Sequence, residues 1–164
     1  GPWYRDSAFY DPEVQFFASR GYAVLQVNMR GSTGYGKAFT KAAKGELAGR
    51  MHDDLIDALD WAIVEGYVDP DRVAIYGSSY GGYAALVGAS FTPDRFAAAI
   101  DYAGVVDLRT LVAEMPSFLR EALRNNWIAY AGNPDNDADN ADMLSRSPVS
   151  RLDQISCPLL VIHG

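Results

Sequence analysis

The sequence has few cysteines and no long apolar runs, the features on which many small secreted, metal-binding and membrane proteins depend. Its one cysteine, Cys157, excludes an internal disulfide framework and any multi-cysteine zinc site. No apolar run approaches the roughly 20 residues that a membrane-spanning helix needs. The 14 lysines and arginines are outnumbered by 21 aspartates and glutamates, and the resulting net charge of −7 disfavours nucleic-acid binding. We therefore expect a globular domain with no membrane span and no bound nucleic acid, metal or cofactor.

The first residues contain no basic start followed by an apolar stretch, so no secretory leader is visible. This slightly favours a cytoplasmic location, although the chain does not begin with methionine. The sequence leaves the oligomeric state open.

Short apolar runs alternate with helical patterns along the chain. We expect strands at residues 22–28, 72–76, 97–103 and 158–163, and helices at 51–65, 80–89 and, with a break at Pro116, 108–130. Residues 132–142 are rich in Asp and Asn and are predicted to form a loop. Continuous apolar strands separated by helices are typical of an α/β fold whose mostly parallel sheet has helices on both faces.

One motif carries chemistry. The strand predicted at 72–76 runs into Gly77-Ser78-Ser79-Tyr80-Gly81, and a helix follows at once. G-x-S-x-G between a strand and a helix is the pattern of a nucleophile elbow, in which small neighbours give a strained serine room to project. The helix N-terminus brings backbone N–H groups to a developing oxyanion. Ser79 is the candidate nucleophile and the Tyr80 backbone N–H the candidate oxyanion donor, the alternative being an ordinary tight turn.

A serine nucleophile needs a base, usually a histidine that a carboxylate orients, and in this kind of fold both follow the serine. The chain has two histidines. His52 precedes Ser79 at the start of a helix, where we expect a partly exposed, non-catalytic residue. His163 ends the last predicted strand, where no further strand follows to position a base. The sequence therefore supplies the nucleophile without a clear base.

Five blocks, in order, resemble the catalytic domain of the prolyl oligopeptidase family of serine peptidases, which includes dipeptidyl-peptidases and acylaminoacyl-peptidases. They are residues 1–3 (the end of a His-Gly-Gly-Pro oxyanion segment), 28–36 (Asn-x-Arg-Gly-Ser-x-Gly-Tyr-Gly), 69–83, 147–148 (Ser-Pro) and 157–164 (Pro-Leu-Leu-x-x-His-Gly). The resemblance covers essentially the whole chain. It implies an α/β-hydrolase fold and a peptidase that forms an acyl-enzyme on Ser79 and cleaves short peptides.

The resemblance also implies that residues 1–164 are an incomplete α/β-hydrolase domain. In the family the catalytic Asp follows the His-Gly pair and the catalytic His comes later, so both would lie outside this chain. An upstream β-propeller and a side-chain oxyanion donor before Gly1 would lie outside it as well. In the family's sheet, the strand that precedes the oxyanion segment lies between the strands that match residues 22–28 and 72–76. If it is missing, 22–28 would have unpaired edges and the chain alone would be sticky or only marginally folded.

By the same resemblance, four residues line the pocket for the residue on the acyl side of the scissile bond: Tyr80, Val105, Leu108 and Leu111. Apolar residues after a strand are more often core residues, so this assignment competes with a structural one.

Other function classes remain open. An esterase or lipase shares the elbow, and a non-catalytic remnant would keep it as architecture only. Residues 31–38 differ from a nucleotide-binding P-loop by one residue, but Ala38 lacks the hydroxyl for Mg²⁺ and Tyr35 is bulky. Residues 135–146 imitate an EF-hand loop, but Arg146 stands where a bidentate Glu is needed.

Overall fold

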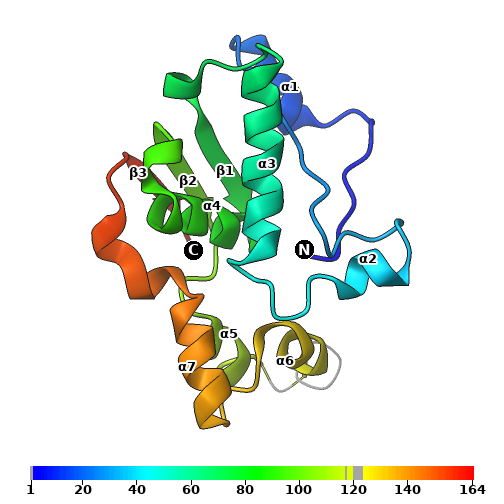
Figure 1. Cartoon of the computed structure of the whole chain (residues 1–164), viewed down its shortest axis with the longest axis vertical. Helices are drawn as coiled ribbons and strands as arrows, with labels where there is room; N and C mark the ends of the chain where they lie inside the picture. Colours follow the sequence, from blue (N-terminus) through cyan, green and yellow to red (C-terminus); the bar gives the residue numbers. More distant parts are fainter. Residues whose placement is uncertain (1, 117, 120–123) are drawn as a thin grey trace.

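The computed structural model describes residues 2–116, 118–119 and 124–164 (Figure 1). Gly1 and part of the helix predicted at 108–130 lie outside these residues. The helices are α1 (Pro12–Ser19), α2 (Lys37–Lys41), α3 (Arg50–Val64), α4 (Tyr80–Phe91), α5 (Leu108–Ala113), α6 (Asn125–Ala131) and α7 (Asp137–Ser145). The strands are β1 (Ala74–Ser78), β2 (Ala98–Tyr102) and β3 (Leu159–Ile162).

The three strands form a parallel sheet in the order β1-β2-β3. Ile75 of β1 pairs with Ala99 of β2, which in turn pairs with Leu159 of β3. Each connection passes through helices, as parallel strands require. Since all three strands run the same way, the residues that follow them meet at one edge of the sheet.

Helices cover both faces of this sheet, as the sequence predicts. Ile75 points toward α4, because its Cδ1 lies 2.9 Å from where a Cβ on Gly88 would stand. Tyr76, the next residue, faces the other side, where its hydroxyl donates a hydrogen bond to Glu13 of α1 and its ring lies 5.5 Å from that of Phe17. The arrangement is the α/β architecture expected from the apolar pattern.

The predicted strand at residues 22–28 is wrong, because the structure has no strand pairing there. The side chains of Tyr22 and Leu25 are 61% and 46% exposed. The apolar and β-branched residues of segment 22–28 suit a strand, but a strand needs a neighbour to pair with, and the described residues have no strand beside this segment.

The predicted loop at residues 132–142 is also wrong in part, because α7 begins inside it. The Asn136 side chain accepts hydrogen bonds from the N–H groups of Ala138 and Asp139, both at 3.0 Å, and so caps the helix. Asp137 and Asp139 lie in the first turn, where carboxylates favour the positive end of the helix. The acidic run is therefore a helix start, and the described residues contain no cluster of ligands for a metal ion.

The core lies between α4 and the helices around its start. Nearly all of α4 is buried, and its Tyr83 and Val87 pack in one cluster with Leu108, Val112 and Met143. The helix therefore has no solvent face and acts as the central support of the molecule. No helix in the described part of the chain is long and apolar enough to cross a membrane.

Candidate active site

Ser79 occupies a strained turn between the end of β1 and the start of α4. Its backbone has φ 57° and ψ −113°, a left-handed conformation that non-glycine residues rarely adopt. Two hydrogen bonds fix it: the Ser79 N–H donates to Tyr102 O of β2 at 2.8 Å, and Ser79 O accepts from the Tyr83 N–H at 3.0 Å. The side chain is exposed. Strain held by the surrounding structure, with an exposed hydroxyl, is the geometry of a presented nucleophile.

The glycines around Ser79 allow backbones to approach closely. A Cβ on Gly77 would lie 2.3 Å from the carbonyl carbon and oxygen of Gly81, so β1 and α4 touch through their main chains. A Cβ on Gly82 would lie 2.4 Å from Asp101 Oδ1 and 2.7 Å from Gly104 Cα. Gly82 thus lets the start of α4 pack against the end of β2 and the loop that follows it. Gly81 differs, because no atom lies within 4 Å of its hypothetical Cβ, and it leaves open space beside the serine.

The Tyr80 backbone N–H is available as a donor at this turn. It lies at the first position of α4, where an N–H has no acceptor within its helix, and no other described residue supplies one. Its side chain turns the other way, into the core, where the hydroxyl donates to Met51 Sδ at 3.6 Å. Burial, with smaller contributions from Tyr83 and Asp54, raises the pKa of Tyr80 well above its ordinary value. The side chain thus stays neutral and anchors the backbone that carries the donor.

His52 lies far from Ser79. Its Nε2 is 3.0 Å from the Oγ1 of Thr92, which caps the opposite end of α4, 13 residues beyond the serine. At about 1.5 Å per residue, these two ends of α4 are roughly 20 Å apart. The expected partial exposure of His52 is wrong: it is buried, because the start of α3 packs on α4, and burial lowers its pKa despite the opposing effect of Asp53.

His163 follows β3 at the same sheet edge as Ser79. It is exposed, and its Nδ1 lies 2.8 Å from Gly164 O. Two strand spacings, roughly 10 Å, separate β3 from β1. The described residues therefore bring no histidine to the hydroxyl of Ser79.

Sequence reasoning missed a buried carboxylate beneath the turn. Asp101, near the end of β2, is 2% exposed, and its Oδ1 accepts a hydrogen bond from the Gly104 N–H at 2.8 Å. Its contact with Gly82 fixes the loop after β2 against α4. An aspartate inside an apolar strand was the available signal, since carboxylates are rarely buried without a partner.

A second missed feature holds the segment after Pro2 in place. The Trp3 ring packs edge-on against Trp127 and Tyr130, with centroid distances of 5.4 and 5.1 Å. Aromatic pairs of this geometry stabilise beyond the area they bury. This cluster fixes the part of the chain that resembles the oxyanion segment.

Arg30 and Asp54 fasten the neighbouring loop to α3. The Asp54 carboxylate accepts from the Arg30 backbone N–H at 2.8 Å, from Nε at 2.9 Å and from Nη2 at 2.6 Å. Burial acts to raise the pKa of Asp54, but the hydrogen bonds and charge of Arg30 outweigh it and the pKa is lowered. The aspartate is therefore ionised and paired at neutral pH.

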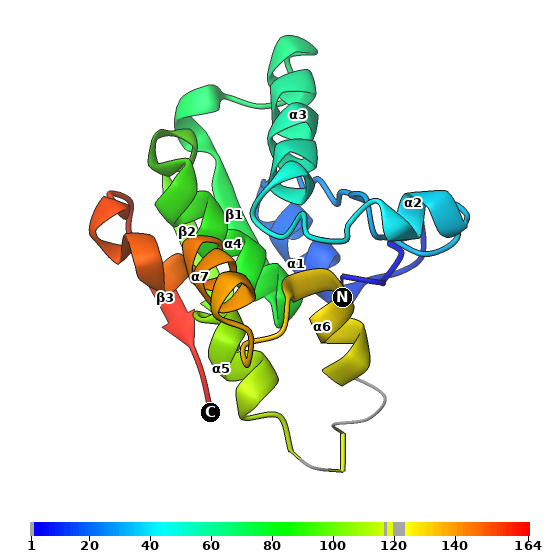
Figure 2. The same cartoon turned by 60° about the horizontal axis from the view of Figure 1, so that its bottom comes forward.

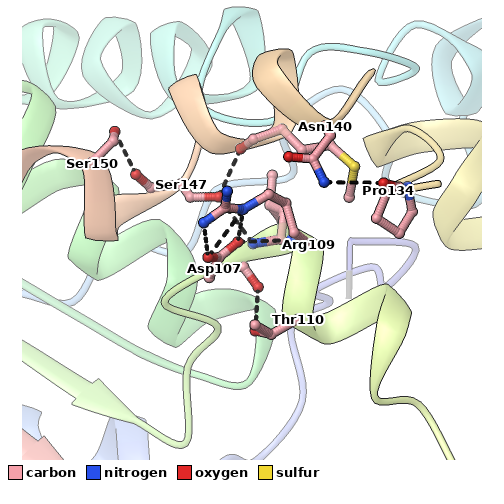
Figure 3. A network of polar contacts seen from close by, with 9 residues as sticks. Asp107, Arg109, Thr110, Pro134, Asn140, Ser147 and Ser150 are labelled. Carbon is pink, nitrogen blue, oxygen red and sulfur yellow. Dashed lines mark hydrogen bonds and ion pairs between the residues drawn. The ribbon is translucent and has the colours of Figure 1, made fainter. Parts of the chain in front are cut away.

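The predicted pocket residues gather around the start of α5. Figure 3 shows the ion pair there, in which Asp107 accepts from Arg109 Nη2, a distance of 2.6 Å. The Ser147 Oγ accepts from the Leu108 N–H at 2.9 Å. Leu108 has no exposed area and Tyr80 is buried with it. Val105 and Leu111 lie half-buried on the margin of the same cluster. The pocket stays a prediction, and of its four predicted residues only Val105 and Leu111 combine exposed surface with contact to the core.

Comparison with known sequences gives a consistent group of relatives. The profile of the prolyl oligopeptidase family matches residues 8–164. The chain is 50% identical over 168 aligned residues to dipeptidyl aminopeptidase BIII of Pseudoxanthomonas mexicana, and 39% identical over 165 to dipeptidyl peptidase family member 6 of Caenorhabditis elegans. The alignments cover all of this chain but 24% and 22% of those relatives. The chain thus spans about a quarter of the length of the curated relatives it matches.

Comparison with solved structures gives relatives from the same group of peptidases. A puromycin-hydrolysing peptidase of Mycobacterium tuberculosis superposes with a TM-score of 0.87 at 33% identity, over 100% of this chain and 24% of its own. An acylaminoacyl peptidase of Pyrococcus horikoshii gives 0.85 at 27% identity, over 99% and 26%. Because the family profile covers nearly every residue and the fold agrees, this chain belongs to the prolyl oligopeptidase family of serine peptidases and has its α/β-hydrolase fold.

Proposed function

We propose that this chain carries the nucleophile of a serine peptidase, which forms an acyl-enzyme on Ser79 and cleaves short peptides. The observation that carries the proposal is the left-handed backbone of Ser79 at the junction of β1 and α4, with its side chain exposed. A non-glycine residue with such a backbone costs stability, and this strain is typical of functional positions.

The chemistry follows from this position. Ser79 Oγ attacks the carbonyl carbon of the scissile bond while a base takes its proton, and the carbonyl oxygen becomes an oxyanion. The Tyr80 N–H donates to that oxyanion at the positive end of α4. When the oxyanion collapses, the protonated base gives its proton to the leaving amine and the acyl group stays on Ser79. Water then attacks the ester and restores the serine.

The acid and base belong, in this proposal, to residues outside these 164. In the family they follow the His-Gly pair that matches His163 and Gly164. The distance of roughly 20 Å along α4 supports this view, because it separates His52 from the serine. The chain is then part of a larger catalytic domain, as its share of about a quarter of its relatives suggests.

The substrates proposed are peptides whose acyl side contacts Val105 and Leu111. Both side chains have exposed surface beside the fully buried Leu108. Relatives named as dipeptidyl aminopeptidases and acylaminoacyl peptidases suggest two substrate types, dipeptidyl and N-acylaminoacyl nitroanilides.

A fluorophosphonate probe tests the assignment, since it reacts only with an activated serine. In the protein that contains this chain together with the proposed acid and base, we expect one probe per molecule by intact mass. Ser79→Ala should abolish labelling and lower nitroanilide turnover by about 10⁵-fold or more. Ser78→Ala is the matched control, because Ser78 is the adjacent serine but pairs within the sheet opposite Tyr102.

Labelling that survives Ser79→Ala, or that disappears in Ser78→Ala alone, would exclude Ser79 as nucleophile. For residues 1–164 alone we expect little or no turnover, because the base is missing. Robust turnover by these residues that depends on Ser79 would disprove the proposed position of the base.

A further inference from the structure

Lysine is rare in this chain, and all of it lies in one short segment. The sequence contains three lysines, Lys37, Lys41 and Lys44, against 21 acidic residues. Their spacing of four and three residues places them on one side of α2 and of the turn that continues it. All three are exposed, and within the described ranges none forms an ion pair, since every ion pair found there uses an arginine.

These lysines line a single groove of about 670 Å³ between α2 and α6. The other residues that line it are Thr33, Gly34, Gly36, Thr40, Asn126, Ala129 and Tyr130. Figures 1 and 2 both place α2 and α6 on the same side of the molecule. The volume lies within the range of ligand-binding clefts, roughly 300–1,000 Å³. A positive groove of this size on a chain of net charge −7 calls for a negatively charged occupant.

Tyr130 fixes the two walls relative to each other. Its hydroxyl donates to Thr40 O at 3.1 Å, and its carbonyl accepts from the Gly45 N–H at 3.0 Å. Lys44 Nζ lies 5.6 Å from the centre of the ring, within the range of a cation–π contact. The groove therefore exists before any ligand binds, which lowers the entropic cost of binding.

The loop before α2 begins with two backbone N–H groups that are bonded within the chain. Residues 31–38 are the segment that resembles a P-loop, which holds phosphate with successive backbone N–H groups. Here the Gly31 N–H donates to Phe39 O and the Ser32 N–H donates to Met29 O, at 3.1 and 3.0 Å. These two amides are therefore not available to an anion, and the charged groups that line the groove are the three lysine ammonium groups.

The spacing of the ammonium groups suits carboxylates on an extended chain. Along the axis of α2, Lys41 lies about 6 Å from Lys37, and Lys44 follows three residues later in the turn after the helix. Carboxylates on alternate residues of an extended peptide are about 7 Å apart and point to one side. Because lysine side chains are long and flexible, each ammonium group can pair with one carboxylate of such a peptide. A compact phosphate would contact only one or two of the three lysines.

We propose that this lysine groove binds an extended acidic peptide segment with carboxylates on alternate residues. The site is separate from the chemistry at Ser79 and does not depend on it. Binding weakens as salt is added, because the charges are exposed and screened.

Fluorescence anisotropy with a labelled Asp-Ala-Asp-Ala-Asp-Ala peptide tests this on the full chain. Replacing all three lysines by glutamine should raise Kd about tenfold, because each exposed charge pair contributes about twofold or somewhat more. Replacing all three by arginine should keep binding within about threefold. The matched control, Arg20→Gln with Arg72→Gln and Arg151→Gln, removes the same charge outside the groove and should leave Kd within about twofold. Circular dichroism checks that each variant folds.

Three outcomes would overturn the proposal. The first is equal peptide affinity in the lysine-to-glutamine variant. The second is no difference between this peptide and an Asn-Ala-Asn-Ala-Asn-Ala peptide. The third is lysine-dependent binding of inorganic tripolyphosphate with no binding of the acidic peptide, which would assign the groove to phosphate.

Discussion

The first and last glycines of the G-x-S-x-G motif should respond very differently to alanine. In Gly77→Ala the new Cβ would lie 2.3 Å from the Gly81 carbonyl, about 1 Å short of ordinary contact, and the atoms it meets are backbone. Only a shift of β1 away from α4 relieves this overlap, and α4 is buried nearly all round. Overpacking of cores costs about 1–3 kcal/mol, and a rigid neighbour places this variant at the upper end, about 3 kcal/mol.

Urea denaturation of the full chain, followed by circular dichroism, measures this cost as a lower midpoint. Gly81→Ala is the matched control, because its Cβ would have no atom within 4 Å and a helical backbone accepts alanine. We expect its free energy of unfolding to stay within about 1 kcal/mol of that of the wild type. Equal midpoints for the two variants would refute the view that backbone contact at Gly77 holds the elbow together.

Three further substitutions test polar groups that are buried or half-buried. Burial lowers the pKa of His52, so the unfolded chain binds the proton more tightly and stability should fall as pH drops below about 6.5; His52→Gln should remove that part of the fall in urea midpoints. The pKa of Asp54 is lowered, so its contribution is present above about pH 4 and lost below; Asp54→Asn should cost about 2 kcal/mol at pH 7 by weakening the acceptors of Arg30, and an unchanged midpoint would contradict this. Tyr83→Phe removes a hydrogen bond of 2.8 Å to Arg146 O and should cost about 1–2 kcal/mol in the same assay, whereas a more stable variant would speak against that bond.

Most of the sheet and its central helix could be predicted from the sequence. The strands expected at 72–76, 97–103 and 158–163 overlap β1, β2 and β3, and the helix at 80–89 is α4 apart from its last turn. Helix α4 is buried almost throughout, so its apolar pattern reports its environment directly, whereas β3 follows the apolar strand pattern although its four residues are exposed. The turn at Ser79 was predictable for another reason, since the motif specifies both the glycines and the strand and helix around them.

The elements and buried residues that the sequence did not predict depend on contacts between distant parts of the chain. Residues 22–28 have the composition of a strand, but pairing needs a neighbour that no local pattern reveals. The start of α7 depends on Asn136 acting as a cap in a stretch whose composition is that of a loop. The burial of His52 was predicted wrongly and that of Asp101 was not predicted, because both residues are buried by packing between elements that are distant in the sequence.

The hydrogen bond from the Ser79 N–H to Tyr102 O has a consequence for folding kinetics. The left-handed turn at the serine is anchored on β2, so it gains its support only after two strands separated by the whole of α4 have paired. Formation of the turn thus waits on a non-local contact, which local helix formation precedes. During refolding, this serine should therefore become reactive later than the far-ultraviolet circular dichroism signal of the helices appears. The rate at which a covalent serine probe labels the chain would then report the formation of this turn.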